Sequence, residues 1–150
     1  MVADRGRHRE DSEPMTAINI ATKTLLAAAP VTAIVGQRIY PVFASEGAKL
    51  PHIVVHLIHE EDNDNLVGAM KYRRSRVSLE LRTAGDIPTL FTLAPLVIAA
   101  MQDKINYSIA GCTATISKEG TDITDASDLT GADGVPQVTR RIMDFSIWWR

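Results

Sequence analysis

Apolar and polar residues alternate with a two-residue period in several segments of the chain, which is typical of β-strands with one buried face. The clearest case is the segment 72–82, where Val77, Leu79 and Leu81 are predicted to face the core. The other alternate residues of this segment are predicted to face outward: Arg76, Ser78, Glu80 and Arg82. The segment 138–149 alternates in the same way and has one apolar set: Met143, Phe145, Ile147 and Trp149.

Three more segments are predicted to be extended. Residues 52–59 are rich in β-branched side chains and form the strongest strand candidate. Residues 107–117 are predicted to form another strand. Residues 38–43 contain Pro41, which cannot donate a hydrogen bond to a neighbouring strand, so they are predicted to be an edge strand or an extended arm.

Apolar residues at three- and four-residue spacing predict a first helix over 16–29. Thr16 is a candidate N-cap for this helix. Pro30 is expected to end it and to begin a short second helix. Gly36 is expected to end that second helix in a left-handed conformation.

The same spacing predicts a second main helix over 86–105, whose apolar face would be covered by a sheet. Phe91 and Ile105 are expected on that apolar face. Pro95 is expected to kink this helix or to split it in two, because proline removes one helical hydrogen bond.

Two polar segments are predicted to be loops: 60–68 and 118–136. The order of elements predicts an α+β fold, a two-layer sandwich in which a mainly antiparallel four- to five-stranded sheet packs on two helices. Residues 1–14 are polar and charged, and are predicted to be a disordered tail before a single domain at 15–150.

Composition agrees with one ordinary globular domain. The chain has 150 residues, of which 45% are hydrophobic, and a formal net charge of -2. This charge argues against a dedicated nucleic-acid-binding protein. No apolar run approaches the ~20 residues that a membrane span needs. A single cysteine excludes an internal disulfide framework.

The residues that could carry chemistry do not form a recognisable site. His52 and His56 would share one face of a strand but lie about 13 Å apart, too far to ligate one zinc ion, so they are predicted to be exposed histidines of that strand. The aspartates of 118–136 lack the spacing of a calcium loop, and Cys112 has no neighbour that would activate it. We therefore predict no catalytic residue, no metal site and no cofactor.

Charge is distributed unevenly along the chain. An acidic set lies between the two central strand candidates: Glu60, Glu61, Asp62 and Asp64. A basic set follows it: Lys71, Arg73, Arg74 and Arg76. Two interpretations stay open, a solvated surface with weak internal ion pairs, and a self-complementary surface that docks a second copy or a charged neighbour.

Three segments, in this order, carry a resemblance to a known family: 31–41 (VTAIVGQRIYP), 47–55 (GAKLPHIVV) and 140–148 (RRIMDFSIW). Together they resemble the tail-completion, or tail-terminator, proteins of long-tailed bacteriophages and gene transfer agents. The resemblance extends over about Ala17 to Trp149. The charged N-terminal tail and the long Asp/Gly-rich loop depart from the usual shape of the family.

The resemblance implies a structural, non-enzymatic role in the virion, at the junction of tail and neck, after assembly in the bacterial cytoplasm. Such proteins form a homo-oligomeric ring, typically a hexamer, on the head-proximal end of the tail tube. The ring stops polymerisation of the tube protein and presents a surface to the head–tail connector or stopper. We expect the acidic and basic sets defined above to make subunit–subunit or ring–tube contacts.

Two alternatives remain. The first is another neck component, such as a head–tail adaptor or stopper, built from a similar small α+β domain. The second is a small-ligand-binding domain or enzyme, which predicts a deep pocket with converging polar side chains.

Overall fold

The computed structural model describes seven ranges of the chain: 17–45, 47–65, 68–84, 87–102, 104–109, 111–126 and 138–150. Only the backbone is described at 62–65, 68–72, 87, 121–123, 125 and 126. The predicted tail at 1–14, the candidate N-cap Thr16 and the part of the predicted polar loop after Ala126 lie outside the described residues.

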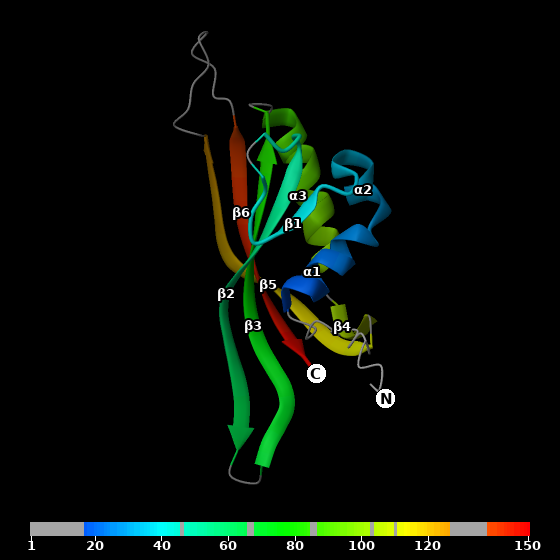
Figure 1. Cartoon of the computed structure of the whole chain (residues 1–150), viewed down its shortest axis with the longest axis vertical. Helices are drawn as coiled ribbons and strands as arrows, with labels where there is room; N and C mark the ends of the chain where they lie inside the picture. Colours follow the sequence, from blue (N-terminus) through cyan, green and yellow to red (C-terminus); the bar gives the residue numbers. More distant parts are fainter. Residues whose placement is uncertain are drawn as a thin grey trace, which may run out of the picture.

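The described residues form three helices and one six-stranded sheet (Figure 1). The helices are α1 (Ala17–Leu26), α2 (Ala29–Val35) and α3 (Ile87–Met101). The strands are β1 (Ile39–Pro41), β2 (His52–Asn65), β3 (Gly68–Thr83), β4 (Lys104–Ile109), β5 (Cys112–Ala126) and β6 (Thr139–Trp149). The sheet order is β1-β2-β3-β6-β5-β4, with β1 parallel to β2 and the other described pairs antiparallel.

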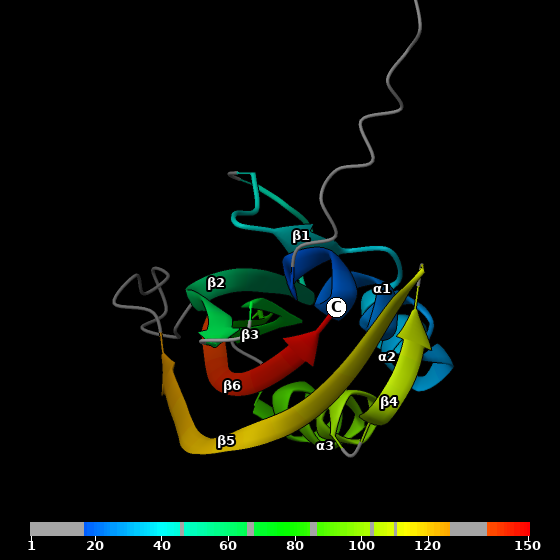
Figure 2. The ribbon, with the colours of Figure 1, turned by 90° about the horizontal axis from the view of Figure 1, so that it is seen from below.

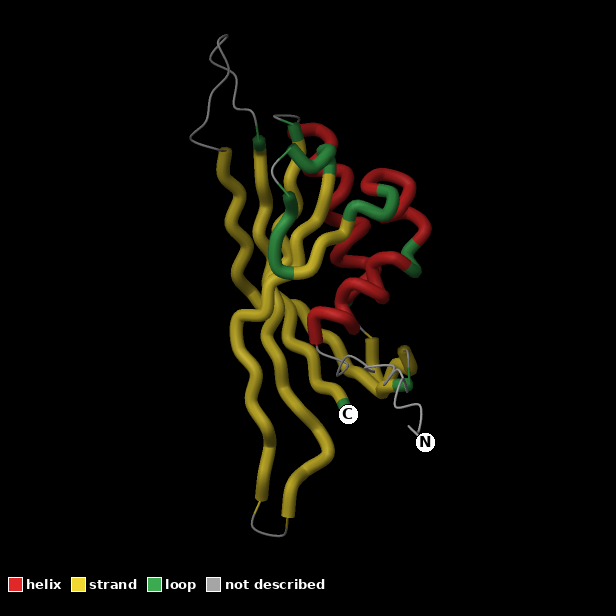
Figure 3. The backbone as a smooth tube through the Cα atoms, in the orientation of Figure 1, coloured by secondary structure: helices red, strands yellow, loops and turns green. Residues whose placement is uncertain are grey.

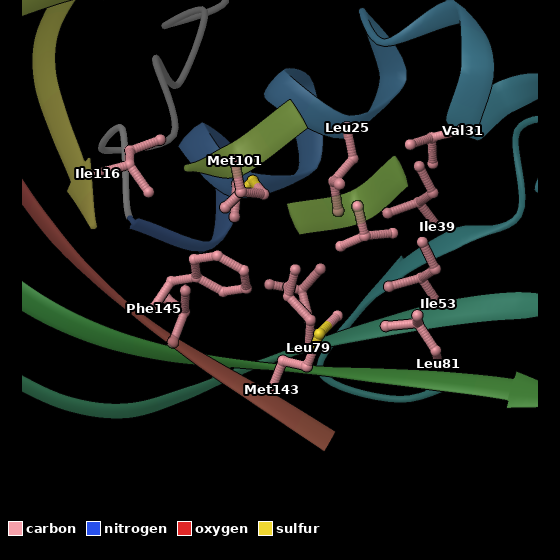
Figure 4. Packing of buried hydrophobic residues seen from close by; sticks show 14 of the residues in the cluster. Leu25, Val31, Ile39, Ile53, Leu79, Leu81, Met101, Ile116, Met143 and Phe145 are labelled. Atoms are coloured by element: carbon pink, nitrogen blue, oxygen red, sulfur yellow. The ribbon is translucent and has the colours of Figure 1, made fainter. Parts of the chain in front are cut away.

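The sheet curls around the helices, as the view along its strands shows (Figure 2). Side chains from both layers meet in one core (Figure 4). The sheet contributes Leu79, Met143 and Phe145, and the helices contribute Leu25 and Met101, all of them fully buried. The predicted inward faces of the segments 72–82 and 138–149 are therefore confirmed.

The start of the chain follows its sequence signals closely. α1 buries Ile20, Ala21 and Leu25 against the sheet, and the Thr24 hydroxyl donates to the Ile20 carbonyl at 2.7 Å. α2 has a proline in its first turn and ends at Gly36, as the sequence predicts. Gly36 has a φ of 59° and a ψ of -131°, a positive-φ conformation that favours glycine but lies outside the left-handed helical region that was expected.

α3 departs from its prediction in two ways. It ends at Met101, so Ile105 belongs to β4 and is 73% exposed. Phe91 is 59% exposed, and its predicted place on the buried face is wrong. Of the two outcomes expected at Pro95, a kink or a split, the split does not occur, because the helix continues through this residue. Pro95 itself is exposed, so the carbonyl that it leaves without a partner lies on the solvated side of the helix.

The predicted strand count of four to five is wrong, because the segment 107–117 forms two strands. β4 and β5 meet in a hairpin at Gly111, whose φ is 83°. The described parts of both predicted polar loops are also strand: β2 runs on to Asn65 and β5 runs on to Ala126. Pairing with β3 and β6 satisfies their backbones, so tertiary context outweighs the low strand propensity of Asp, Asn and Glu.

The outward face of the sheet is more buried than alternation predicts. Ser78 is 5% and Glu80 is 6% exposed, although both were expected to face solvent. His52 is 3% exposed, so its expected surface position is wrong as well. Its Nδ1 lies 3.1 Å from the Lys49 carbonyl, and its ring meets that of Tyr40 edge to face. The chain that leads from β1 to β2 therefore covers this part of the outward face.

Candidate functional site

The central strands are longer than the helices that cover them. β3 has 16 residues and spans about 53 Å at 3.3 Å per residue, whereas the 15 residues of α3 span about 22 Å. Part of the β2–β3 pair must therefore extend beyond the helical layer, and Figure 3 shows this extension. We call residues 57–65 and 68–76 the hairpin arm.

The hairpin arm unites the two charged sets that the sequence singles out. Backbone pairing places Glu61 opposite Arg74 and Asp62 opposite Arg73. The carboxylate of Glu61 lies 3.6 Å from the Arg74 guanidinium and 3.6 Å from the ring of His59. Asp64 and Lys71 lie on the same two strands, toward the tip. The two charged sets thus lie on facing strands of one hairpin, with Glu61 and Arg74 as an ion pair between them.

Two tryptophans hold the base of the hairpin arm. Trp149 lies opposite Arg73 and Trp148 lies opposite Arg74 in the β3–β6 pairing. Each guanidinium sits over the ring of its partner, at 5.6 Å for Arg73 and 5.3 Å for Arg74. Because neighbouring residues of a strand point to opposite faces, the arm is held by one Arg–Trp pair on each face.

A short hydrogen-bond chain adds to this contact. The Trp149 indole N–H donates to the Ser75 hydroxyl at 3.1 Å, and Ser75 donates to Glu60 Oε1 at 3.0 Å. Ser75 is fully buried. Three strands, β6, β3 and β2, are therefore tied together at the point where the arm leaves the body.

A shallow hollow of ≈ 270 Å³ lies beside this base. Its lining residues are Ile58, His59, Glu61, Arg74, Arg76, Glu119 and Ser146. Arg76 donates to Asp144 at 2.8 Å, so its charge is already compensated within the chain. The hollow contains ion pairs and exposed apolar carbon, and it lacks a nucleophile–base pair.

Glu80 is the centre of the most connected charged group in the body of the sheet. Its carboxylate accepts two hydrogen bonds from Arg82, at 3.0 and 3.1 Å, and one from Arg140 at 3.4 Å. His56 Nε2 lies 3.2 Å away. Burial alone would raise the pKa of Glu80, but the hydrogen bonds and charge of Arg82, with His56 and Arg140, hold it below its ordinary value.

No metal site is apparent among the described residues, where no cluster of three or more His, Cys, Asp or Glu is suited to hold an ion. Cys112 is a free thiol at the start of β5. No single described helix is long and apolar enough to cross a membrane; α1 and α2 taken together reach that length and composition but are bent by 87°.

Comparison with known proteins shows similarity in the fold but none in the sequence searches. No protein-family model matches the sequence, and no curated protein matches it. Among solved structures, the chain is similar to one from the virion of a native gene transfer agent (GTA) particle. The two are 17% identical with a TM-score of 0.58, and the match covers 88% of this chain and 96% of the other. This curled α+β fold therefore also occurs in a chain of a gene transfer agent virion.

The residues that hold the arm were not predicted from the sequence. Trp149 was assigned only to the apolar face of its strand, and Trp148 and Ser75 were given no role. The available signal was the pair of adjacent tryptophans at the end of one strand and of adjacent arginines in another. Matching them requires the register between β3 and β6, which joins residues more than seventy positions apart.

Proposed function

We propose that this chain is a structural protein of a phage or gene-transfer-agent particle and that it acts as the tail terminator. In this role, copies of the chain form a ring on the head-proximal end of the tail tube. The ring covers the polymerising surface of the tube and presents a different surface to the head–tail connector. The single observation that carries the proposal is the fold shared with a GTA virion chain over 96% of that chain's length.

The hairpin arm supports an assembly role on physical grounds. The body of the sheet is stabilised by its helices, but the arm extends past them and none of the described helices covers it. β1 pairs with β2 only at Ile53–Val55, so the outer backbone edge of β2 lacks a described partner strand along the arm. Long open edges attract other chains unless they are protected. We infer that the arm, with both charged sets, lies at subunit–subunit or ring–tube contacts.

Deletion of the gene tests the proposal directly. Without a terminator, tube growth has no end signal, so we expect overlong tubes of variable length and heads without tails by electron microscopy. A missing adaptor or stopper gives unjoined heads as well, but its tubes keep the normal length. Normal tube length in the deletion strain would therefore reject the terminator role and favour another neck component.

Charge reversal tests the arm. We expect the double variant Arg73→Glu and Arg74→Glu to keep the folded body while weakening assembly, because it places like charges opposite Asp62 and Glu61. Assembly is measured as the fraction of particles with joined heads and tails, and folding by circular dichroism. A collapsed spectrum would show that these two arginines are needed for the fold itself. The matched control is Lys23→Glu, an exposed charge on α1.

A further inference from the structure

Two buried side chains lie on the outward face of the sheet, on the side away from the main core. His52 is 3% exposed and Val54 is fully buried, although alternation along β2 turns both of them away from the helices. We call these two residues the outward patch. The loop that joins β1 to β2 lies outside the curl of the sheet, as Figure 2 shows. Its residues 47–51, which we call the cover, come directly before His52 in the chain.

The ring of His52 connects the cover and β1 to the sheet. Its Nδ1 lies 3.1 Å from the Lys49 carbonyl of the cover, and the ring meets that of Tyr40 on β1 edge to face, at 5.5 Å between centroids. A carbonyl can only accept a hydrogen bond, so we assign the proton of the neutral ring to Nδ1. Nε2 is then an acceptor, and it is buried without a hydrogen-bond partner among the described residues.

A second proton on this ring is disfavoured by every element around it except one carboxylate. It makes Nε2 a buried donor without a described acceptor and gives a buried ring a full charge. Arg82, which lies opposite His52 on β3, adds a like charge, and Arg38 before β1 does the same. Glu80 also faces the ring from β3, but Arg82 and Arg140 already hold its carboxylate.

The balance of these effects sets the direction in which pH acts. Burial lowers the pKa of His52 below 6.5, and the charges of Arg82 and Arg38 add to this, against the Lys49 carbonyl and Glu80. A ring that reaches water regains its ordinary pKa of about 6.5. The covered state is therefore fully favoured above about pH 6.5, and it becomes less stable relative to an open state as pH falls below that value.

The cover can leave the outward patch without unfolding the body. All five residues of the cover are exposed or partly exposed, and none of them belongs to the main core. Two described hydrogen bonds tie it to its surroundings: the contact of the Lys49 carbonyl with His52, and a bond of 2.9 Å from Arg38 Nε to the Pro51 carbonyl. Segments with little apolar burial open at low cost in free energy.

We infer that the cover is a pH-sensitive element, which stays closed while His52 is neutral and releases the outward patch when this ring takes up a second proton. Protonation and release occur together, because the new Nε2–H reaches an acceptor only in water. The outward face beside β1 therefore changes its exposed surface with pH. The inference uses no ring or tube contact, so it stands or falls independently of the proposed function.

Relaxation-dispersion NMR of the full chain tests the inference. The population of the open state, measured at the methyl groups of Val54, should rise between pH 7.5 and pH 5.5 by up to about tenfold, the limit for one proton taken up with an ordinary pKa of about 6.5. The methyl groups of Leu79, which is fully buried in the main core, should show no such rise. Nitrogen-15 spectra of the His52 ring should show the Nδ1–H tautomer at pH 7.5.

Two variants assign the effect to one ring. His52→Asn keeps a donor for the Lys49 carbonyl but takes up no proton, so the rise at Val54 should disappear. His56→Asn is the matched control, because His56 lies on the same face of β2 with a side chain that is 36% exposed, and it should keep the rise.

Four results would overturn the inference. They are a constant open population in the wild type, an equal rise at Leu79, a rise that persists in His52→Asn, and an Nε2–H tautomer in the wild type. The first, second and fourth use the unmodified chain, so they decide the matter even where circular dichroism shows that His52→Asn does not fold.

Discussion

Removal of the Glu80 carboxylate is expected to destabilise the body of the sheet. The Glu80 side chain is 7% exposed, whereas the side chains of Arg82, His56 and Arg140 are 30%, 36% and 43% exposed. Truncating one partner of a fully buried ion pair costs about 3–5 kcal/mol. The cations around Glu80 regain water more easily than fully buried ones, so we expect Glu80→Ala to lower the free energy of unfolding by about 2 kcal/mol.

The pH dependence of this loss gives the prediction a second part. The pKa of Glu80 is held below its ordinary value of 4.5, so the folded state binds a proton less readily than the unfolded chain. Its stabilising contribution is therefore fully present above about pH 4.5 and is lost as pH falls through the folded-state pKa. The difference in unfolding free energy between wild type and Glu80→Ala should therefore shrink as pH falls.

Urea unfolding at several pH values measures both parts. Asp144→Asn is the control, because the guanidinium of Arg76 that Asp144 contacts is 44% exposed, and the change should cost at most about 1 kcal/mol. A loss below about 0.5 kcal/mol for Glu80→Ala at neutral pH would refute the reasoning, since it would mean that the cations stabilise the carboxylate no better than water does.

Two other changes follow from the described contacts. Phe145→Ala should lower the free energy of unfolding by about 3–5 kcal/mol, because Phe145 is fully buried, while Phe91→Ala on the exposed side of α3 should change it by less than about 0.5 kcal/mol in the same urea titrations. Burial lowers the pKa of His52 from 6.5, so the unfolded chain binds the proton more readily, and stability should fall as pH drops below about 6.5. His52→Phe should reduce that fall in stability. If the variant loses as much stability as the wild type below about pH 6.5, His52 is not the group responsible.

The parts of the fold that the sequence predicts well are those where one face of an element is buried. Val77, Leu79 and Leu81 alternate with polar residues, and a half-buried strand is the only regular element that matches this pattern. Gly36 was predicted at a helix end because a residue with positive φ is needed there. In both cases the signal is local, so a single sequence contains it.

The errors share a different physical cause. Residues 60–65 and 118–126 are polar, yet they are strand because β3 and β6 supply their hydrogen bonds. Glu80 was expected in solvent, yet it is buried because Arg140 comes from β6 to meet it. Each of these features depends on a partner that is distant in the sequence, and hydrophobic periodicity contains no information on such partners.

Under the proposed function, the division between body and hairpin arm gives stability and assembly separate physical origins. In the body, side chains such as Phe145 are buried between sheet and helices, where one truncation removes a large part of the net stability. In the arm, the described contacts are cross-strand charge pairs and the Arg–Trp pairs at its base, each worth about 0.2–1 kcal/mol. Substitutions in the arm can therefore change what the protein contacts while the body stays folded. An assembly defect from Arg74→Glu at unchanged unfolding free energy would have this origin, whereas a defect from Phe145→Ala would reflect loss of the folded state.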